Sequence, residues 1–257
     1  MLTTKVAMRS CCRFLVGTIL IWFALTPTAN AQSEFDNAQK EAIGELIRDY
    51  LLENPELVAE AMDKYYVGRE AKLEAEAMAA LRENWDELLS DPSSYVAGNP
   101  EGDLTVVEFF DYNCSFCRLA MPILLKTLKN DSNIRLVLKE FPIRGRDSEK
   151  VARMAMASLS QEKYFDYHVA LMEAEGHMTV DRAKDIAKDM HLNVKQLRKD
   201  MDDPEFDKII ARNEELADLL FVDGTPAFII GDQIIRGWPG EEKFLSLIAE
   251  ARGEQLD

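Results

Sequence analysis

The sequence predicts an α/β domain with a block of helices inserted between its strands, preceded by an N-terminal helical segment. Three observations lead to this fold class. Residues 104–141 read as a strand, a helix and a second strand; residues 148–220 show helical periodicity without a strand signal; and residues 226–252 read as a hairpin followed by a helix. The first unit has about the minimum length of a parallel crossover, so the helical block separates a parallel pair of strands from the hairpin.

Residues 1–31 are typical of a cleavable secretory signal. Basic residues precede the apolar stretch 14–25, and small residues surround the expected cut after Ala31. A membrane-spanning helix needs about 20 apolar residues, so this stretch is too short to be an anchor. We therefore expect an exported protein from which the signal has been removed.

The chain that this cut leaves has 226 residues, enough for one sizeable core and an appendage. Loss of Lys5, Arg9 and Arg13 with the signal takes the formal net charge from −16 to −19. So acidic a chain is not expected to bind nucleic acid, because such binding requires Lys and Arg to neutralise phosphates.

Residues 32–90 are predicted to form the N-terminal helical segment. Apolar residues recur at helical spacing up to Asn54-Pro55, which ends one helix and starts another. Gly68 lies between two apolar stripes of the second helix and is the expected position of a bend. A narrow stripe buries little surface alone, so the segment should pack on the rest of the chain or on copies of itself. We expect a homo-oligomer, a trimer or a dimer, formed through residues 37–90.

The second domain is predicted to span residues 91–257. It opens with turn-rich sequence on both sides of a short Tyr95-Val96 segment. The elements expected after it are a buried strand over 104–110, a helix over 115–129, a strand over 134–141, a helical insertion at about 148–220, strands over 226–230 and 233–236, and a helix over 240–252.

Cys114 and Cys117 lie three residues apart at the start of the helix predicted over 115–129. Cys11 and Cys12 leave with the signal, so these are the two cysteines of the exported chain. The unsatisfied N–H groups and the dipole at a helix N-terminus favour a thiolate there. We therefore expect Cys114 to be a nucleophile with a lowered pKa and Cys117 to be the sheltered resolving thiol of a redox pair.

Two other interpretations of this cysteine pair are less consistent with the sequence. A zinc site needs four ligands, and the exported chain offers only His168, His177 and His191 besides, none at a paired spacing. Each histidine is expected to be an ordinary polar residue on a helix or loop. A structural disulfide across so short a loop would constrain little of the unfolded chain.

Two stretches, "VVEFFDYNCSFCRLAMP" and "GTPAFIIGDQIIRGW", carry a resemblance to a known family. Over residues 104–252 the chain resembles the disulfide bond protein A family, thioredoxin-like domains of the bacterial periplasm with a block of helices inserted in the fold. The resemblance implies a thioredoxin-like fold and a periplasmic location. The N-terminal segment is similar to that of the suppressor-of-copper-sensitivity protein C subfamily, some of whose members trimerise through it and act as disulfide isomerases.

The resemblance also assigns roles to residues. Cys114 and Cys117 match the redox-active pair, with no other cofactor implied. Thr225 and Pro226 match the dipeptide with a cis proline that lies against the active site and meets a substrate peptide edge-on; the alternative is a trans proline that opens a strand. Glu108 matches a buried acid that relays a proton to or from Cys117, and the alternative is a strand glutamate that faces solvent.

One departure from the family bears on the reaction. Strongly oxidising members have a histidine between the cysteines, where this chain has Ser115 and Phe116. Less stabilisation of the thiolate makes a couple less oxidising, and Thr225 resembles isomerases more than the oxidase. Both differences favour isomerase or reductase chemistry.

The leading hypothesis is a periplasmic thiol–disulfide oxidoreductase, a disulfide isomerase that acts on exported cysteine-containing proteins and is kept reduced by a membrane reductase. One alternative is a monomeric dithiol oxidase, recharged by a quinone-linked membrane protein. The other is a copper(I)-binding module for copper tolerance, because two thiolates suit soft Cu(I).

Overall fold

The computed structural model describes residues 35–253, and the predicted signal with its cut after Ala31 lies outside them, as do Cys11 and Cys12. The chain divides into two compact units, Met1–Glu60 and Ala61–Asp257. Among the residues described, no helix combines the length and apolarity needed to cross a membrane.

The first unit contains α1 (Asn37–Glu53) and the beginning of α2 (Pro55–Glu83). α1 starts at a capping box, in which Asp36 Oδ1 accepts from the Gln39 backbone N–H at 2.8 Å and Gln39 Oε1 accepts from the Asp36 N–H at 3.0 Å. It ends at Asn54, whose side chain donates to the carbonyl of Tyr50. α1 buries none of its residues, and Tyr50 is 56% exposed.

α2 runs without interruption through Gly68, so the bend predicted there is absent. One glycine in a helix interior costs about 1 kcal/mol, which the strong helix formers around it outweigh. Toward its C-terminus α2 buries Ala77 and Leu81, and the short helix α3 (Trp85–Ser90) buries Leu88. The last part of the predicted N-terminal segment therefore belongs to the core of the second unit.

The second unit is built on a five-stranded mixed sheet with the order β1-β3-β2-β4-β5. Its strands are β1 (Tyr95–Gly98), β2 (Leu104–Phe110), β3 (Ile134–Glu140), β4 (Ala227–Ile230) and β5 (Gln233–Arg236). β2 and β3 are parallel, with Glu108 opposite Leu138, and the other pairs are antiparallel. The Tyr95-Val96 segment, too short for a strand signal, is an edge strand that pairs with β3.

Successive side chains of β2 point to opposite faces of the sheet, and each face has its own hydrophobic core. Val106 and Phe110 pack with α4 (Ser115–Asn130) and α10 (Glu241–Arg252), whereas Val107 and Phe109 pack with the end of α2, α3 and α9 (Pro204–Leu219). Glu108 lies on the face that α4 covers, because side chains two residues apart share a face. This places an acid beneath the helix that carries the cysteines.

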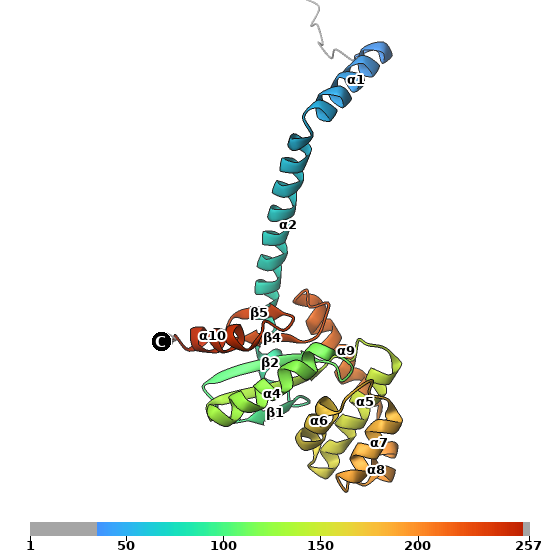
Figure 1. Ribbon diagram of the computed structural model, residues 1–257, viewed down its shortest axis with the longest axis vertical. Coiled ribbons are helices and arrows are strands. Elements are labelled where there is room, and N and C mark those ends of the chain that lie inside the picture. The colour runs from blue at the N-terminus through green and yellow to red at the C-terminus, as the bar shows by residue number, and fades with distance from the viewer. Residues whose placement is uncertain (1–34, 254–257) are drawn as a thin grey trace, which may run out of the picture. The chain divides into compact units, whose positions relative to one another are not determined.

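The helices between β3 and β4 are the insertion that the sequence predicts. They are α5 (Arg146–Ala157), the 3-10 turn η1 (Ser158–Gln161), α6 (Tyr164–Glu173), α7 (Val180–Asp189), α8 (Val194–Asp200) and α9. α5 packs against α6, α7 and α8, and these four gather beside one end of the sheet (Figure 1). The predicted thioredoxin-like α/β fold with a helical insertion is confirmed.

Candidate active site

The dithiol lies at the N-terminus of α4. Cys114 caps the helix with an extended backbone, its N–H donating to the Asp111 carbonyl and its carbonyl accepting from the Arg118 N–H. Cys117 follows in the first turn, and both cysteines are free thiols. The two sulfur atoms therefore meet the helix end where unsatisfied N–H groups favour negative charge.

The pKa of Cys114 is lowered to about 5. The thiol of Cys117 is the largest cause, since it donates to the Cys114 sulfur; the Thr225 hydroxyl and the backbone N–H groups of Cys117 and Phe116 add to it, while burial opposes them. At neutral pH Cys114 is therefore a thiolate, which is the form that attacks disulfides.

The Cys114 side chain has no exposed surface. Its sulfur lies 2.9 Å from the Thr225 carbonyl oxygen, a contact in which the thiol donates and which the thiolate loses. The Thr225 hydroxyl is buried and has no hydrogen-bond partner among the described residues, so it is available to donate to the Cys114 thiolate once that forms. The Cys114 sulfur is therefore inaccessible in this structure, although attack on a substrate disulfide requires that the substrate reach it.

Glu108 and Cys117 form the buried side of the site. Glu108 is fully buried and neither carboxylate oxygen has a hydrogen-bond partner among residues 35–253, which decides against the solvent-facing alternative. Burial first, and then the charge of Cys114, raise the pKa of Glu108 to about 8. Burial also raises the pKa of Cys117 far above that of a free thiol, with further contributions from Cys114 and Glu108. Cys117 is therefore protonated until a base takes its proton.

The loop before β4 brings Thr225 and Pro226 to the dithiol. The bond between them is cis, as the resemblance implies. The Pro226 carbonyl accepts from the Gly237 N–H at 2.9 Å, which ties this loop to the end of β5. The structure thus brings Cys114, Cys117, Thr225 and Glu108, the residues named from the sequence, into one site with Pro226 next to Thr225.

Arg144 is a member of the site that the sequence analysis did not identify. It lies in the loop after β3, and its guanidinium Nη2 is 3.9 Å from Cys114 Sγ. Its backbone N–H donates to Asp111 Oδ2 at 2.8 Å. No basic residue lies between the two cysteines. Arg144, 30 residues after Cys114, places a positive charge beside the sulfur instead.

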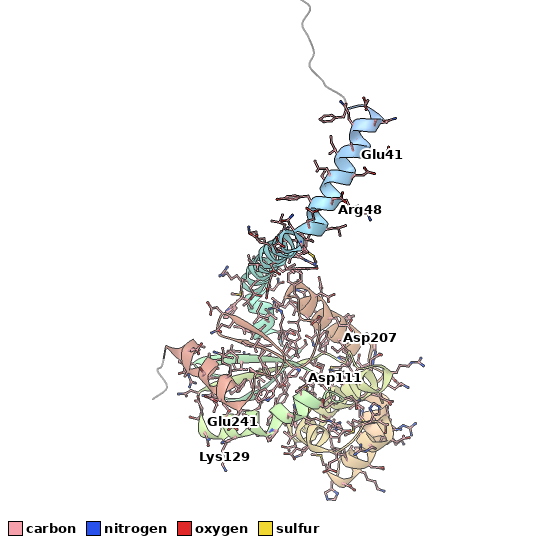
Figure 2. All side chains as sticks on the ribbon, turned by 45° about the horizontal axis from the view of Figure 1, so that its top comes forward. Glu41, Arg48, Asp111, Lys129, Asp207 and Glu241 are labelled. Atoms are coloured by element: carbon pink, nitrogen blue, oxygen red, sulfur yellow. The ribbon has the colours of Figure 1, made fainter. Side chains whose placement is uncertain are left out.

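Asp111 organises the loop between β2 and α4 and lies among the side chains where the sheet meets the inserted helices (Figure 2). Its buried carboxylate accepts from the Asn113 N–H at 2.6 Å, the Ser148 hydroxyl at 2.7 Å and the Arg144 N–H at 2.8 Å. Three donors satisfy most of its acceptor capacity, so burial of this charge is compensated. Asp111 therefore fixes the Arg144 loop relative to the dithiol.

Asn113 connects the dithiol loop to the helical insertion. Its Oδ1 accepts from the Met178 N–H at 2.7 Å, and its Nδ2 donates to the Met178 carbonyl at 3.0 Å and to Ser148 Oγ at 3.1 Å. Arg118 adds bonds to the carbonyls of Tyr112 and Ala174. The residue beside the nucleophile is therefore held directly by the insertion.

His168 differs from the ordinary polar histidine that the sequence suggested. It is fully buried, and its Nδ1 lies 3.1 Å from the hydroxyl of Tyr112. Tyr112 and Tyr164 both donate to Glu140 Oε1, at 3.1 and 2.8 Å. Burial raises the pKa of Glu140 to about 8 and lowers that of His168 to about 3, so both are neutral in the core at pH 7.

Within residues 35–253 no three His, Cys, Asp or Glu side chains converge as a metal site would require. A copper(I) ion held by two thiolates would need only Cys114 and Cys117, and that alternative stays a prediction.

A thiol of low pKa with a second thiol three residues further on performs disulfide exchange, which defines the class as thiol–disulfide oxidoreductases. Comparison with known proteins gives the family. The DSBA-like thioredoxin domain matches residues 105–249, and the chain belongs to that family. Residues 39–72 match the copper resistance protein ScsC N-terminal domain.

Solved structures agree with this assignment. A thioredoxin-like oxidoreductase from Silicibacter pomeroyi is 40% identical, with a TM-score of 0.64, over 66% of this chain and 98% of the other. A linker-deletion mutant of Proteus mirabilis ScsC is 25% identical, also with a TM-score of 0.64, over 87% of this chain and 99% of the other. The second match includes the N-terminal helical region.

Curated relatives cover less of the chain. A probable disulfide bond formation protein D from Bacillus cereus is 24% identical over 60% of this chain and 77% of its own length. The Na(+)/H(+) antiporter NhaA 1 of Salinispora arenicola is 29% identical over 143 residues, 54% of this chain but only 22% of the antiporter.

Proposed function

We propose that this protein is a periplasmic disulfide isomerase that acts on exported cysteine-containing proteins. The observation that carries the exchange chemistry of this proposal is the pKa of about 5 at Cys114, at the N-terminus of α4 and beside the Thr225 backbone, with a protonated Cys117 behind it. Cys114 is ionised and Cys117 is protonated. Cys114 therefore attacks the substrate first, and Cys117 acts in the later, resolving step.

In the first step the Cys114 thiolate attacks one sulfur of a substrate disulfide. A bond forms between Cys114 and that sulfur, the substrate bond breaks, and the other substrate sulfur leaves as a thiolate. The loop before β4 pairs edge-on with the substrate backbone next to the attacked sulfur. In isomerisation the released thiolate then attacks another disulfide of the substrate and sets a different substrate thiolate free. That thiolate attacks the substrate sulfur of the mixed disulfide, and Cys114 leaves again as a thiolate.

In the second step, where no rearrangement occurs, Cys117 attacks the Cys114 sulfur and releases the substrate thiolate. Cys117 must first lose its proton. Formation of the mixed disulfide removes the Cys114 charge, one of the two causes that raise the pKa of Glu108. Glu108 then becomes a carboxylate more readily and accepts the Cys117 proton.

Self-association through residues 37–90 supports isomerisation, because several dithiols around one substrate raise their effective concentration. Exposed apolar side chains on α1 and α2 favour a trimer or a dimer; Leu46 is 69%, Val67 67% and Tyr65 64% exposed. Cys114 must be reduced to attack, so a membrane reductase is the proposed redox partner.

A dithiol oxidase is the second candidate, and the low pKa of Cys114 favours it. A stabilised thiolate stabilises the reduced form and makes the couple more oxidising, and Arg144 offsets the missing histidine between the cysteines. A quinone-linked membrane oxidase would then be the partner.

Two ribonuclease assays on residues 32–257 test these candidates. An isomerase restores activity to scrambled ribonuclease when it is supplied with a reductant, and Cys114→Ala abolishes this activity. An oxidase restores activity to reduced ribonuclease faster than it rearranges the scrambled form. A chain that does neither, and that forms no mixed disulfide as the Cys117→Ala variant, would contradict the proposed function.

A further inference from the structure

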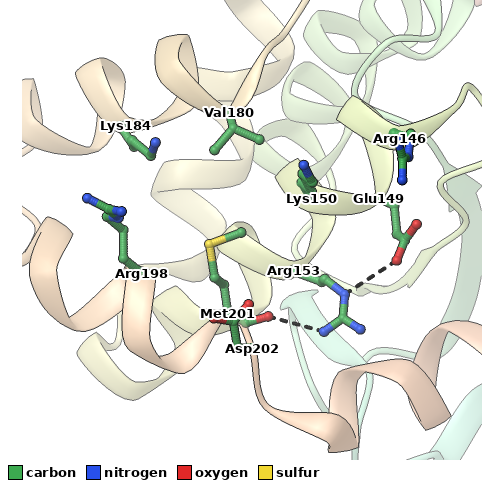
Figure 3. A pocket seen from close by; sticks show the side chains of 9 residues that line it. All are labelled: Arg146, Glu149, Lys150, Arg153, Val180, Lys184, Arg198, Met201 and Asp202. Atoms are coloured by element: carbon green, nitrogen blue, oxygen red, sulfur yellow. Dashed lines mark hydrogen bonds and ion pairs between the residues drawn. The ribbon is translucent and has the colours of Figure 1, made fainter.

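A basic pocket lies on the helical insertion, on a chain whose formal net charge is −16. The pocket has a volume of about 570 Å³, and five of its nine lining side chains are basic (Figure 3). They are Arg146, Lys150 and Arg153 of α5, Lys184 of α7 and Arg198 of α8; the rest are Glu149, Val180, Met201 and Asp202. Two carboxylates against five cations leave an excess of three positive charges.

Two of the five basic residues, Arg153 and Lys184, form ion pairs within residues 35–253, and the other three do not. Arg153 forms ion pairs with Glu149 and Asp207 and donates to the Met201 carbonyl, so its charge is used within the fold. Lys184 pairs with Asp181, whose side chain is 91% exposed. In the described part of the chain, Arg146, Lys150 and Arg198 have neither an ion pair nor a side-chain hydrogen bond. Glu149 and Asp202 are the acidic members of the lining, and Asp181 interacts electrostatically with Arg198, so positive charge remains in excess and favours an anionic ligand.

Two lining residues of the pocket follow closely in the chain on residues that contact the dithiol or its loop. The guanidinium of Arg144 contacts Cys114. Arg146 is two residues further along the chain, so the Cα atoms of Arg144 and Arg146 are at most about 7 Å apart. Val180, on another wall, is two residues from Met178, which is bonded through its backbone to Asn113. Two walls of the pocket are thus continuous with the segments that hold the active-site loop.

We propose that this pocket binds an acidic segment of the substrate polypeptide close to the disulfide that Cys114 attacks. The inference rests on the proposed function and adds a substrate class to it: proteins with Asp and Glu near the reacting cysteine. Val180 and Met201 provide apolar contact for the side-chain methylenes of Glu, which a small inorganic anion could not use. The negative charge of the rest of the chain repels such a segment elsewhere and directs it to this pocket.

The test uses residues 32–257 with Cys117→Ala, so that the mixed disulfide accumulates. The probes are two synthetic peptides, each with one cysteine in a disulfide with cysteamine, followed after a short spacer by four Glu or by four Gln. Mass spectrometry gives the rate of mixed-disulfide formation with Cys114. At low ionic strength we expect the acidic peptide to react about tenfold faster than the neutral one, and added salt to reduce this ratio.

Charge reversal of two cations of the pocket, Lys150→Glu with Arg198→Glu, should reduce the ratio of the two rates about tenfold. The matched control is Lys188→Glu with Lys195→Glu, which makes the same change in net charge at exposed positions of α7 and α8 outside the pocket and should leave the ratio as it was. Thermal unfolding of both double variants verifies that they are folded.

The outcomes separate the inference from the proposed function. A ratio near one in the parent protein, or an equal fall of the ratio in both double variants, would overturn the basic pocket as a substrate site and leave the exchange chemistry standing. A lower particle mass of the Lys150→Glu, Arg198→Glu variant in light scattering would assign the pocket to a second copy of this chain instead, and would also overturn it. If neither peptide reacts with Cys114, the proposed function fails and the inference fails with it.

Discussion

Nη2 of Arg144 lies 3.9 Å from Sγ of Cys114, although the two residues are 30 positions apart in the chain. The Arg144 backbone is held in place by Asp111, so this contact is built into the loop after β3. The guanidinium favours the thiolate over the thiol, and solvent screens part of its effect because Arg144 is exposed.

Arg144→Ala should therefore raise the pKa of Cys114 above its value of about 5. An exposed pair contributes roughly 0.2–1 kcal/mol, and Cys114 is half ionised at pH 5, so alkylation at that pH should slow by up to about threefold. Arg144→Lys should restore most of the rate, and Arg146→Ala, which removes the same charge two residues away, should leave it unchanged. Equal rates for Arg144→Ala and the parent protein would show that the contact does not act on the thiolate.

Glu108→Gln keeps the size of the buried side chain but removes its ability to accept a proton. Attack by Cys114 should persist, whereas release of the mixed disulfide by Cys117 should slow by about a hundredfold, the lower end of the range for a lost acid–base group. Single-turnover reaction with a peptide disulfide, quenched in acid, measures both steps. Glu101→Gln, at an exposed loop position, is the control. Unchanged release would exclude Glu108 as the base.

The buried Glu140 should make stability depend on pH. Its pKa is about 8 in the folded chain against 4.5 in the unfolded chain, so the folded state holds the proton more tightly. The stability that this provides is complete below about pH 4.5 and is lost as pH rises toward 8, by at most about 1.4 kcal/mol per pH unit. Relative to Glu140→Gln, the parent protein should lose free energy of unfolding in urea between pH 5 and pH 8. His168 and Glu108 are common to both proteins, so parallel pH profiles would contradict this assignment.

Asn113→Ala should loosen the connection between the dithiol loop and the helical insertion. It removes the bonds to both backbone groups of Met178 and to Ser148, and leaves a partly buried N–H without a partner. The expected loss of stability is about 1–3 kcal/mol in urea unfolding. Asn133→Ala, at an exposed side chain without such bonds, should cost much less. If the two variants unfolded at the same urea concentration, the Asn113 bonds would have no net stabilising effect.

The helical segment should hold the subunits of an oligomer together. Leu46→Gln with Ile47→Gln places two polar side chains where the chain exposes 69% and 54% of apolar ones, without loss of a buried residue in α1. Light scattering should show that the particle mass falls to that of one chain. The scrambled-ribonuclease assay should show that isomerase activity falls as well. Arg48→Gln is the control on the same helix. Point variants are preferable to removal of residues 32–90, because Leu81 and Leu88 are buried in the core of the second unit.

The sequence was sufficient to predict those parts of the fold and site that depend on local patterns. Periodicity located the strands around Glu108 and Ile229 and the helical insertion, and the spacing of Cys114 and Cys117 indicated the dithiol. Arg144 could not be predicted, because its role depends on how a loop 30 residues away folds back over α4. Asp111 was not singled out from the sequence, although its three accepted hydrogen bonds set that geometry.

The complete burial of the Cys114 side chain has a consequence for what the protein reacts with. Small oxidants such as peroxide or glutathione disulfide meet the sulfur only in the minority of molecules whose loops have locally opened. A polypeptide that forms its own contacts with those loops binds the opened state and increases its population. The accessibility of the Cys114 sulfur thus favours protein disulfides over small oxidants, before any electron is exchanged.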